Sequence, residues 1–536
     1  MKTILTCIVL MLAVHPLFSQ KSKKLEQLFS TYEKAGLFSG SVLIAEKGKI
    51  IFENSYGYRN APKKEKNTNN SLYRVFSTTK MFTATVIFQL EEKGKLSLND
   101  KLSKYYPDFP KGDSITIAQL LSHTSGIPND TNSEYTVDEE TFIKYISAKP
   151  LNFSPGKDWD YSNSGYYILG YIIKKVTGLN YDQVIENNIL KPLKMNHSGF
   201  SFNNITDENK AFGYEFLSDK RSNEALRFKT DHPFAAGAMY STVEDLFKFN
   251  EALKNYTLIK KEITDKAFTP YLKDHYGLGF QISTGFDKKR VGHDGGGPGY
   301  RSRYYRVLDD DICVIVISNS ELSHSDFIIP QVEKILYDKP YSIPAIAKVS
   351  VEDLKKLEGV YSTENSNFYI TSNDGLLVFK EGSYPRNALL PKSKTSFQLD
   401  EKFTCTFQPD QNGKINTVVI HFWDGTVKTA KRKANTLTCG IIGNATPSGW
   451  DGKDIPLQKD PKNPNIYFLK NYKLNKGNLK FRINNDWGYS LGLNNDNKSI
   501  AFDAYDFPIH EDGIYDIVLD MTNAVKPQYS IQKSNP

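Results

Sequence analysis

Apolar residues in the first 344 positions follow two spacings in turn, one helical and one alternating. The stretch "TKMFTATVIFQLEEKG" has apolar residues three and four positions apart and ends at Gly94, which predicts a helix. "SGSVLIAEKGKIIFENSYGYRN" alternates around Lys47-Gly48 and predicts a β-hairpin. "YYILGYIIKKVTG" predicts another helix, ended by Gly178, and "YYRVLDDDICVIVISNS" predicts antiparallel strands. Residues 20–344 are therefore predicted to form one α/β unit, an antiparallel sheet flanked by helices.

The pattern changes after Pro344. Residues 345–436 contain short strands such as "GLLVFK" and "INTVVIHF", separated by Asn, Asp and Gly turns, which predicts a small all-β domain. From "CGIIGNATPSGWDG" onward, residues 437–536 again show strands and turns. The predicted fold class is multidomain: an α/β domain followed by two small all-β domains.

The N-terminus has the features of a targeting segment. "MKTILTCIVLMLAVHPLFSQ" combines a basic Lys2, an apolar run and a small residue before Gln20, which predicts a signal peptide over residues 1–19. That run is too short to cross a bilayer and no later stretch is long enough, so no transmembrane segment is predicted. We expect export to the periplasm or the cell exterior. The three cysteines after the signal cannot all pair, and Cys313 in "DICVIVISN" is expected to be a buried strand residue.

Composition excludes several classes of function. The formal charge of +7 over 536 residues is spread thinly, and basic runs such as "KSKKLEQ" are short, so no nucleic-acid partner is predicted. The nine histidines form no H-E-x-x-H pattern, and no metal or other cofactor is predicted. No G-x-S-x-G elbow and no Walker loop occur, which excludes α/β-hydrolase and nucleotide chemistry.

Ser-x-x-Lys occurs three times. Ser154 lies in a turn with Pro and Gly, and Ser530 lies in a predicted strand, where residues three apart face opposite sides. Only Ser77 opens an apolar helix, which puts it one turn from Lys80. A lysine in that place can activate a serine hydroxyl as a nucleophile. The alternative is a helix-capping serine followed by a solvated lysine.

Two further segments offer partners for this pair. Tyr161 and Asn163 stand in "WDYSNSGYYILGYII", a polar loop before a helix. A nearby ammonium would lower the pKa of Tyr161 so that it acts as a general base, and Asn163 would bond Lys80 and a substrate amide. His293 begins the Gly-rich "HDGGGPGYRSRYYRV", where Gly295 and Gly296 let a substrate approach the backbone, and the N–H of Gly296 would join that of Ser77 as an oxyanion hole.

These three motifs, in this order within one α/β unit, resemble the serine β-lactamase and penicillin-binding protein superfamily. The likeness is nearest to its class C β-lactamase, D-alanyl-D-alanine carboxypeptidase and esterase branch. It covers residues from about 30 to 340 and includes "LLSHTSGIP", "LKPLKMNHSGF" and "AAGAMYSTVEDLFKF".

The resemblance implies Ser77 as the acylated nucleophile, Lys80 as its activating partner and Tyr161 as the proton relay. Asn163 would contact substrate and Lys80. His293 stands where many members carry the Lys of a Lys-Thr-Gly strand, which resembles the carboxypeptidase and esterase members and argues against efficient β-lactam hydrolysis.

The last domain resembles the β-sandwich domains of SusE/SusF-type starch-binding outer-membrane proteins, through "IIGNATPSGWDGKD", "GNLKFRINNDWGYSLG" and "GIYDIVLDM". That likeness implies glycan binding on aromatic platforms, with Trp450, Trp487 and Tyr489 as candidates. The alternative is that these rings simply pack the sandwich.

Three functions follow for testing. The first is a secreted serine hydrolase that forms an acyl-enzyme on Ser77 with a small-molecule or peptide substrate bearing an amide or ester. The second is a true class C-like β-lactamase. The third is a non-catalytic glycan-binding adapter that retains the hydrolase fold.

Overall fold

A computed structural model of the chain describes residues 20–131, 138–217, 222–225, 233–273, 275–373, 375–382, 386–432, 438–493, 498–502, 504–522 and 527–534. The predicted signal peptide lies outside these residues. The chain divides into two compact units, Met1–Tyr341 and Ser342–Pro536. Among the described helices, none is both long enough and apolar enough to cross a membrane.

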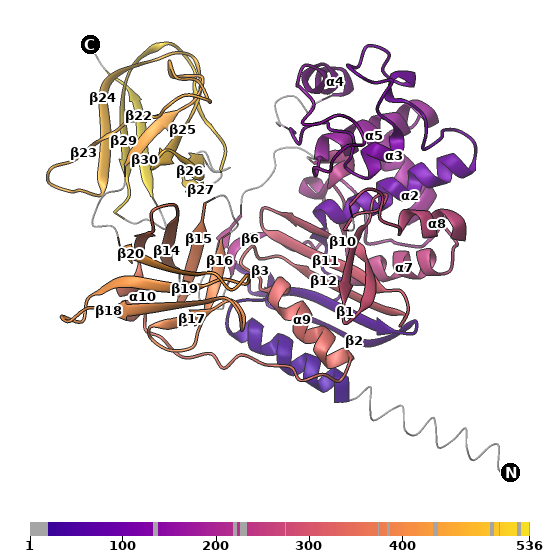
Figure 1. Ribbon diagram of the computed structural model, residues 1–536, viewed down its shortest axis with the longest axis horizontal. Helices are drawn as coiled ribbons and strands as arrows, with labels where there is room; N and C mark the ends of the chain where they lie inside the picture. The colour runs from indigo at the N-terminus through magenta and orange to yellow at the C-terminus, as the bar shows by residue number, and fades with distance from the viewer. Residues whose placement is uncertain are drawn as a thin grey trace. The chain divides into compact units, whose positions relative to one another are not determined.

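The first unit is built on a six-stranded antiparallel sheet in the order β2-β1-β12-β11-β10-β9 (Figure 1). Paired residues lie on the same face of such a sheet, and one row runs Leu43, Ile315, Tyr304, His293. The predicted hairpin is confirmed, because β1 pairs with β2 across the turn at Lys47-Gly48. The strands are β1 (Gly40–Glu46), β2 (Lys49–Tyr56), β9 (Gln281–Gly285), β10 (Lys288–Gly297), β11 (Tyr300–Val307) and β12 (Ile312–Ser318).

Helices cover both faces of this sheet, which is why β12 is buried along its whole length. A helix over residues 20–34 and α9 lie on one side, and the larger group of helices gathers on the other (Figure 1). Phe29 of the N-terminal helix stacks on Phe52 of β2, whereas Phe82 of α2 stacks on Phe249 of α7. The helices are α2 (Thr79–Glu92), α3 (Ile117–Leu121), α4 (Glu139–Ser147), α5 (Asn163–Thr177), α6 (Tyr181–Ile185), α7 (Val243–Lys254), α8 (Lys261–Ala267) and α9 (Ser325–Leu336).

Short pairs of strands connect the helices to the sheet. The pair β5 with β8 matters most for the site, because β5 leads directly into the turn that carries Ser77. Cys313 is buried in β12, as predicted, and Cys313, Cys405 and Cys439 are all free thiols. The short strands are β3 (Tyr58–Asn60), β4 (Glu65–Lys66), β5 (Tyr73–Arg74), β6 (Tyr214–Leu217), β7 (Ser222–Glu224) and β8 (Tyr240–Ser241).

The second unit begins with helix α10 (Val351–Leu357) and a closed eight-stranded antiparallel barrel. Tyr361 of β13 pairs with Arg432 of β20, and this pairing closes the barrel. The strands are β13 (Gly359–Ser362), β14 (Asn367–Asn373), β15 (Leu376–Glu381), β16 (Asn387–Pro391), β17 (Ser396–Gln398), β18 (Thr404–Pro409), β19 (Ile415–His421) and β20 (Val427–Arg432).

The remaining strands form two sheets over a shared core that includes Phe481, Leu491 and Ile517, so this part is a β-sandwich. One sheet has the order β22-β21-β25-β26-β27, with β28 also paired to β25, and the other has the order β23-β24-β29-β30. The strands are β21 (Cys439–Ile442), β22 (Ile455–Pro456), β23 (Gln458–Lys459), β24 (Ile466–Leu474), β25 (Gly477–Ile483), β26 (Asp486–Leu493), β27 (Ile500–Phe502), β28 (Phe507–Ile509), β29 (Gly513–Asp520) and β30 (Gln528–Lys533).

Tyr489 is not a surface aromatic, and its prediction as a glycan platform is wrong. The residue has 0% exposure, and its ring lies 3.6 Å from the ring of Tyr369 in the barrel. Its hydroxyl accepts a hydrogen bond from the Gly382 N–H (2.8 Å) and donates to the Asn367 carbonyl oxygen (3.0 Å). Tyr489 therefore links the sandwich to the barrel, and two barrel residues, Val360 and Tyr369, belong to the core of the sandwich.

Candidate active site

Ser77 lies on a single turn of 3-10 helix, Phe76–Thr78, directly before α2. Every residue from Ser71 to Leu90 is buried except Ser77. Helix α2 is buried on all sides, and not only along the expected apolar band. Its polar side chains form hydrogen bonds within the first unit. Thr83, for example, donates to the Ala235 carbonyl oxygen over 2.7 Å. Within this buried segment, Ser77 is thus the one residue that solvent or a substrate can reach.

Lys80 reaches Ser77 from the first turn of α2. Its Nζ lies 3.1 Å from the Oγ of Ser77, 2.7 Å from the Oδ1 of Asn163 and 2.8 Å from the carbonyl oxygen of Ala236. All three partners are neutral oxygens, and the side chain is fully buried. Burial therefore lowers the pKa of Lys80 well below its ordinary value, which favours the neutral amine.

Tyr161 approaches Ser77 from the segment before α5, and its hydroxyl donates to the Ser77 Oγ over 2.8 Å. The low phenol pKa expected from a neighbouring ammonium is not found. Burial instead raises the pKa of Tyr161 above its ordinary value, so the hydroxyl keeps its proton. Of the two ways to activate Ser77, the electrostatics favour a neutral Lys80 as base and a protonated Tyr161 as donor.

The loop that contains "SHTSGIP" holds Tyr161 in place. His123 Nδ1 accepts a hydrogen bond from the Ser162 N–H (3.0 Å), and the His123 carbonyl oxygen accepts one from the Asp160 N–H (3.0 Å). The imidazole ring lies 4.3 Å from the Tyr161 ring, centroid to centroid. The role of His123 is thus to position the tyrosine loop, and it does not contact Ser77 in any described hydrogen bond.

His293 lies on β10 facing the site, but both of its ring nitrogens are used inside the protein. Nδ1 lies 2.6 Å from the Asp294 carbonyl oxygen, which can only accept, so Nδ1 carries the proton. The neutral Nε2 then accepts from the Tyr276 hydroxyl at 2.9 Å. Burial lowers the pKa of His293 to about 3. The predicted substrate-contacting role of the His293 side chain is therefore not supported by this geometry, because the ring offers no free N–H.

The glycines after His293 bring β10 against the Ser77 turn. A Cβ at Gly295 would lie 2.0 Å from the Val75 carbonyl oxygen, so only glycine allows this approach. Strand β9 pairs with β10 only as far as Gly292. Beyond this point the Asp294 N–H, on the same edge of β10, donates to the Gln281 side chain. Alternate residues of an antiparallel strand point their N–H groups the same way, so the Gly296 N–H lies on this uncovered edge.

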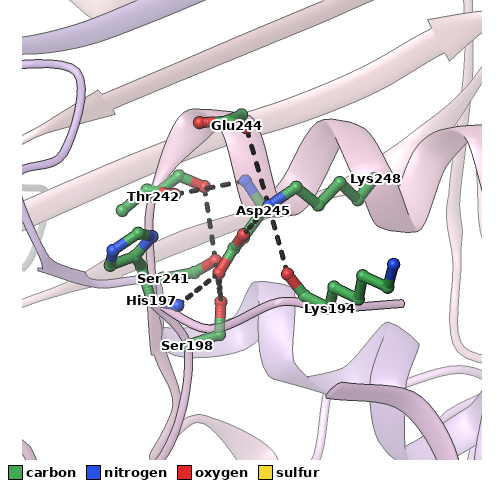
Figure 2. A network of polar contacts seen from close by, with 8 residues as sticks. All are labelled: Lys194, His197, Ser198, Ser241, Thr242, Glu244, Asp245 and Lys248. Carbon is green, nitrogen blue, oxygen red and sulfur yellow. Dashed lines mark hydrogen bonds and ion pairs between the residues drawn. The ribbon is translucent and has the colours of Figure 1, made fainter. Parts of the chain in front are cut away.

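A His-x-Gly sequence like that at His293 also occurs at His197, where it belongs to a separate polar network (Figure 2). The buried carboxylate of Asp245 in α7 accepts from the His197 N–H (2.8 Å) and the Ser198 hydroxyl (2.9 Å). Ser198 also bonds Ser241 of β8 over 2.7 Å. This network anchors β8, and the segment before β8 supplies the Ala236 carbonyl oxygen that bonds Lys80. The motifs around His197 and Asp245 are therefore structural supports of the site.

The structure thus gathers Ser77, Lys80, Tyr161 and Asn163 in one hydrogen-bonded group, with β10 alongside. Sequence reasoning missed two contributors, Ala236 and Tyr276. Ala236 acts through its backbone, and only its place in "AAGAMYSTVEDLFKF" pointed to the segment. The contact of Tyr276 with His293 could not be predicted, because a tyrosine in "YGLGF" has the same sequence context as an ordinary strand residue.

The chain is similar to several known proteins. A family model described as Beta-lactamase matches residues 25–334. Penicillin-binding protein 4* of Bacillus subtilis (strain 168) is 31% identical over 414 residues, which are 71% of this chain and 92% of that protein. The putative penicillin-binding protein PbpX of the same bacterium is 37% identical over 261 residues, 48% of this chain and 66% of that protein.

Among solved structures, the octameric penicillin-binding protein homologue from Pyrococcus abyssi superposes with a TM-score of 0.53 and 26% identity. The match covers 77% of this chain and 98% of that chain. None of these similarities bears on the likeness of the last domain to SusE/SusF-type proteins, which stays a prediction. With a family model over more than half its length and a relative matched over most of both chains, this chain belongs to the Beta-lactamase family, in the superfamily of penicillin-binding-protein-like serine hydrolases.

Proposed function

We propose that the protein is an exported serine hydrolase that forms an acyl-enzyme on Ser77 with a peptide, amide or ester substrate. The observation that carries the proposal is the contact of the accessible Ser77 hydroxyl with both Lys80 (3.1 Å) and Tyr161 (2.8 Å). A nucleophile within hydrogen-bond reach of a base, itself oriented by further partners, is the signature of covalent catalysis.

In the proposed acylation, one proton passes from Ser77 to Lys80 and another from Tyr161 to the leaving group. The neutral amine of Lys80 takes the Ser77 proton while Oγ attacks the substrate carbonyl carbon. The carbonyl oxygen becomes an oxyanion between the N–H groups of Ser77 and Gly296. As this intermediate collapses, Tyr161 donates its proton to the leaving group and recovers the proton held by Lys80. In deacylation the same groups activate water, which releases the acid and frees Ser77.

The protonation and hydrogen bonds of His293 indicate which substrates the site can bind. A neutral ring with both nitrogens bonded internally offers no cation and no donor to a carboxylate beside the scissile bond. Desolvating a carboxylate without a partner is costly. We therefore propose uncharged amides or esters as better substrates than peptides with a free terminal carboxylate. β-Lactam antibiotics carry such a carboxylate, so the alternative of an efficient β-lactamase is disfavoured.

A matched pair of peptides tests this proposal: an N-acyl-D-alanyl-D-alanine and its C-terminal amide, which differ only in the carboxylate. We expect kcat/KM to be higher for the amide by about tenfold or more, since a lost charged hydrogen bond costs about 1.5–3 kcal/mol. Release of the terminal residue would be measured by liquid chromatography. Equal or faster cleavage of the free acid would show that another cation binds the carboxylate.

A glycan-binding role for the last domain has one supporting observation. Trp450 and Trp487 are neighbours with ring centroids 6.0 Å apart, and Trp487 is 45% exposed. We propose this pair, without Tyr489, as an aromatic platform for a sugar ring. Retention of the full chain on insoluble polysaccharide should fall for Trp487→Ala. Unchanged retention in that variant, or no retention at all, would rule the platform out.

A further inference from the structure

The barrel and the sandwich of the second unit enclose a cavity of about 300 Å³. This volume is at the lower end of the range for small-molecule sites. Most of its wall is apolar: the barrel contributes Val360, Tyr369 and Val378, and the sandwich contributes Tyr467, Ile483 and Phe502. The cavity lies within one compact unit and shares no residue with the Ser77 site.

The charged residues in the wall are mostly of one sign. Lys380, Arg386 and Arg432 line the cavity, against a single carboxylate, Glu358. That carboxylate already accepts hydrogen bonds from the Ser372 N–H (2.8 Å) and the Ser372 hydroxyl (2.6 Å). The cavity wall therefore combines an apolar lining with three basic side chains.

Arg432 is the basic residue of this wall that carries the argument. Its guanidinium donates to the Tyr361 hydroxyl, from Nη2 at 2.7 Å and Nε at 3.1 Å, and to the Lys356 carbonyl oxygen at 2.5 Å. These acceptors are neutral, and within the described parts of the chain Arg432 forms no ion pair with a carboxylate. A cation at an apolar wall is stabilised by a counter-ion. Lys380, only 4% exposed, is a second basic residue in the wall, and its Nζ lies 5.6 Å from the centre of the Tyr489 ring.

We propose that this cavity binds an organic carboxylate with an apolar body, such as a medium-chain acyl group. The apolar residues would bury the chain, and Arg432 would pair with the carboxylate head, a geometry that guanidinium groups favour. Binding here needs no acyl transfer, so the inference stands apart from the function proposed for Ser77.

The test is a calorimetric titration of the full chain with decanoate, compared with decanol below its solubility limit and decyltrimethylammonium below its micelle concentration. We expect one saturable site for decanoate, with the neutral and cationic probes weaker by about tenfold or more. Arg432→Gln should weaken decanoate binding about tenfold. Lys431→Gln, an exposed neighbour on β20, is the matched control and should bind as the parent does.

Thr371→Trp provides a second variant in case Arg432→Gln does not fold, because it fills the cavity and leaves the cations in place. It should abolish decanoate binding while circular dichroism stays unchanged. Equal affinity for decanoate and decanol would overturn the carboxylate assignment. Absence of saturable binding, or decanoate binding that survives Thr371→Trp, would overturn the site. Labelling of Ser77 by a fluorophosphonate, measured in the same samples, reports separately on the hydrolase proposal.

Discussion

Replacing Ser77 by alanine is expected to remove all covalent labelling by a fluorophosphonate, because the variant lacks the oxygen that attacks the probe. The fold should survive. Ser77 Oγ accepts a hydrogen bond from Tyr161 and lies 3.1 Å from Lys80 Nζ, and losing one such neutral partner costs about 1 kcal/mol in the free energy of unfolding. Intact-mass analysis after exposure to the probe measures the adduct, and urea unfolding measures the stability.

Ser154→Ala is the matched control, since Ser154 begins a second Ser-x-x-Lys but lies exposed in a loop. It should label at the parent rate. A parallel exposure to a β-lactam separates two kinds of hydrolase: a lasting Ser77-dependent adduct would place the protein with penicillin-binding peptidases, whereas a fluorophosphonate adduct alone favours ester or amide substrates. Labelling that persists in Ser77→Ala would refute the nucleophile assignment, and a parent protein that labels with neither probe would favour the adapter hypothesis.

Lys80→Met is expected to slow labelling of Ser77 by about 10²–10⁴-fold, the usual contribution of a general base. Methionine has a similar length and no charge, so the substitution removes the proton acceptor while filling the same buried space. The protein should remain folded, because the variant no longer has to bury a potential ammonium. Lys93→Met, at an exposed position just after α2, is the control and should label as the parent does.

The pH dependence of labelling distinguishes the two candidate bases. Burial lowers the pKa of Lys80, so its neutral form becomes available as pH rises through that lowered value. The labelling rate should therefore rise with pH and level off below about pH 10, the ordinary pKa of a phenol. Burial raises the pKa of Tyr161, so a phenolate base would require a rise only above that pH. A profile that rises only above about pH 10 would show that Lys80 is not the base.

Much of the candidate site could be predicted because its motifs are local. Ser77 and Lys80 are three residues apart, and helical spacing alone brings them together. The joint presence of Tyr161 and His293 identified the superfamily, but their protonation states could not be predicted. Those states depend on burial and on contacts between distant segments, such as the bond from Lys80 to Ala236 across 156 positions.

The sequence by itself determined several of the helices and strands, the change from an α/β unit to all-β parts, and the side chains of Lys80, Tyr161 and Asn163 that gather at Ser77. These features follow from the spacing of apolar and turn residues within short segments. Only the tertiary structure decided that α2 is buried on every side, that His293 is closed off by Tyr276 and Asp294, and that Tyr489 joins barrel to sandwich. The physical reason is that burial is a property of the packed chain: a tyrosine has the same spacing in a strand whether its outer face meets water or another domain.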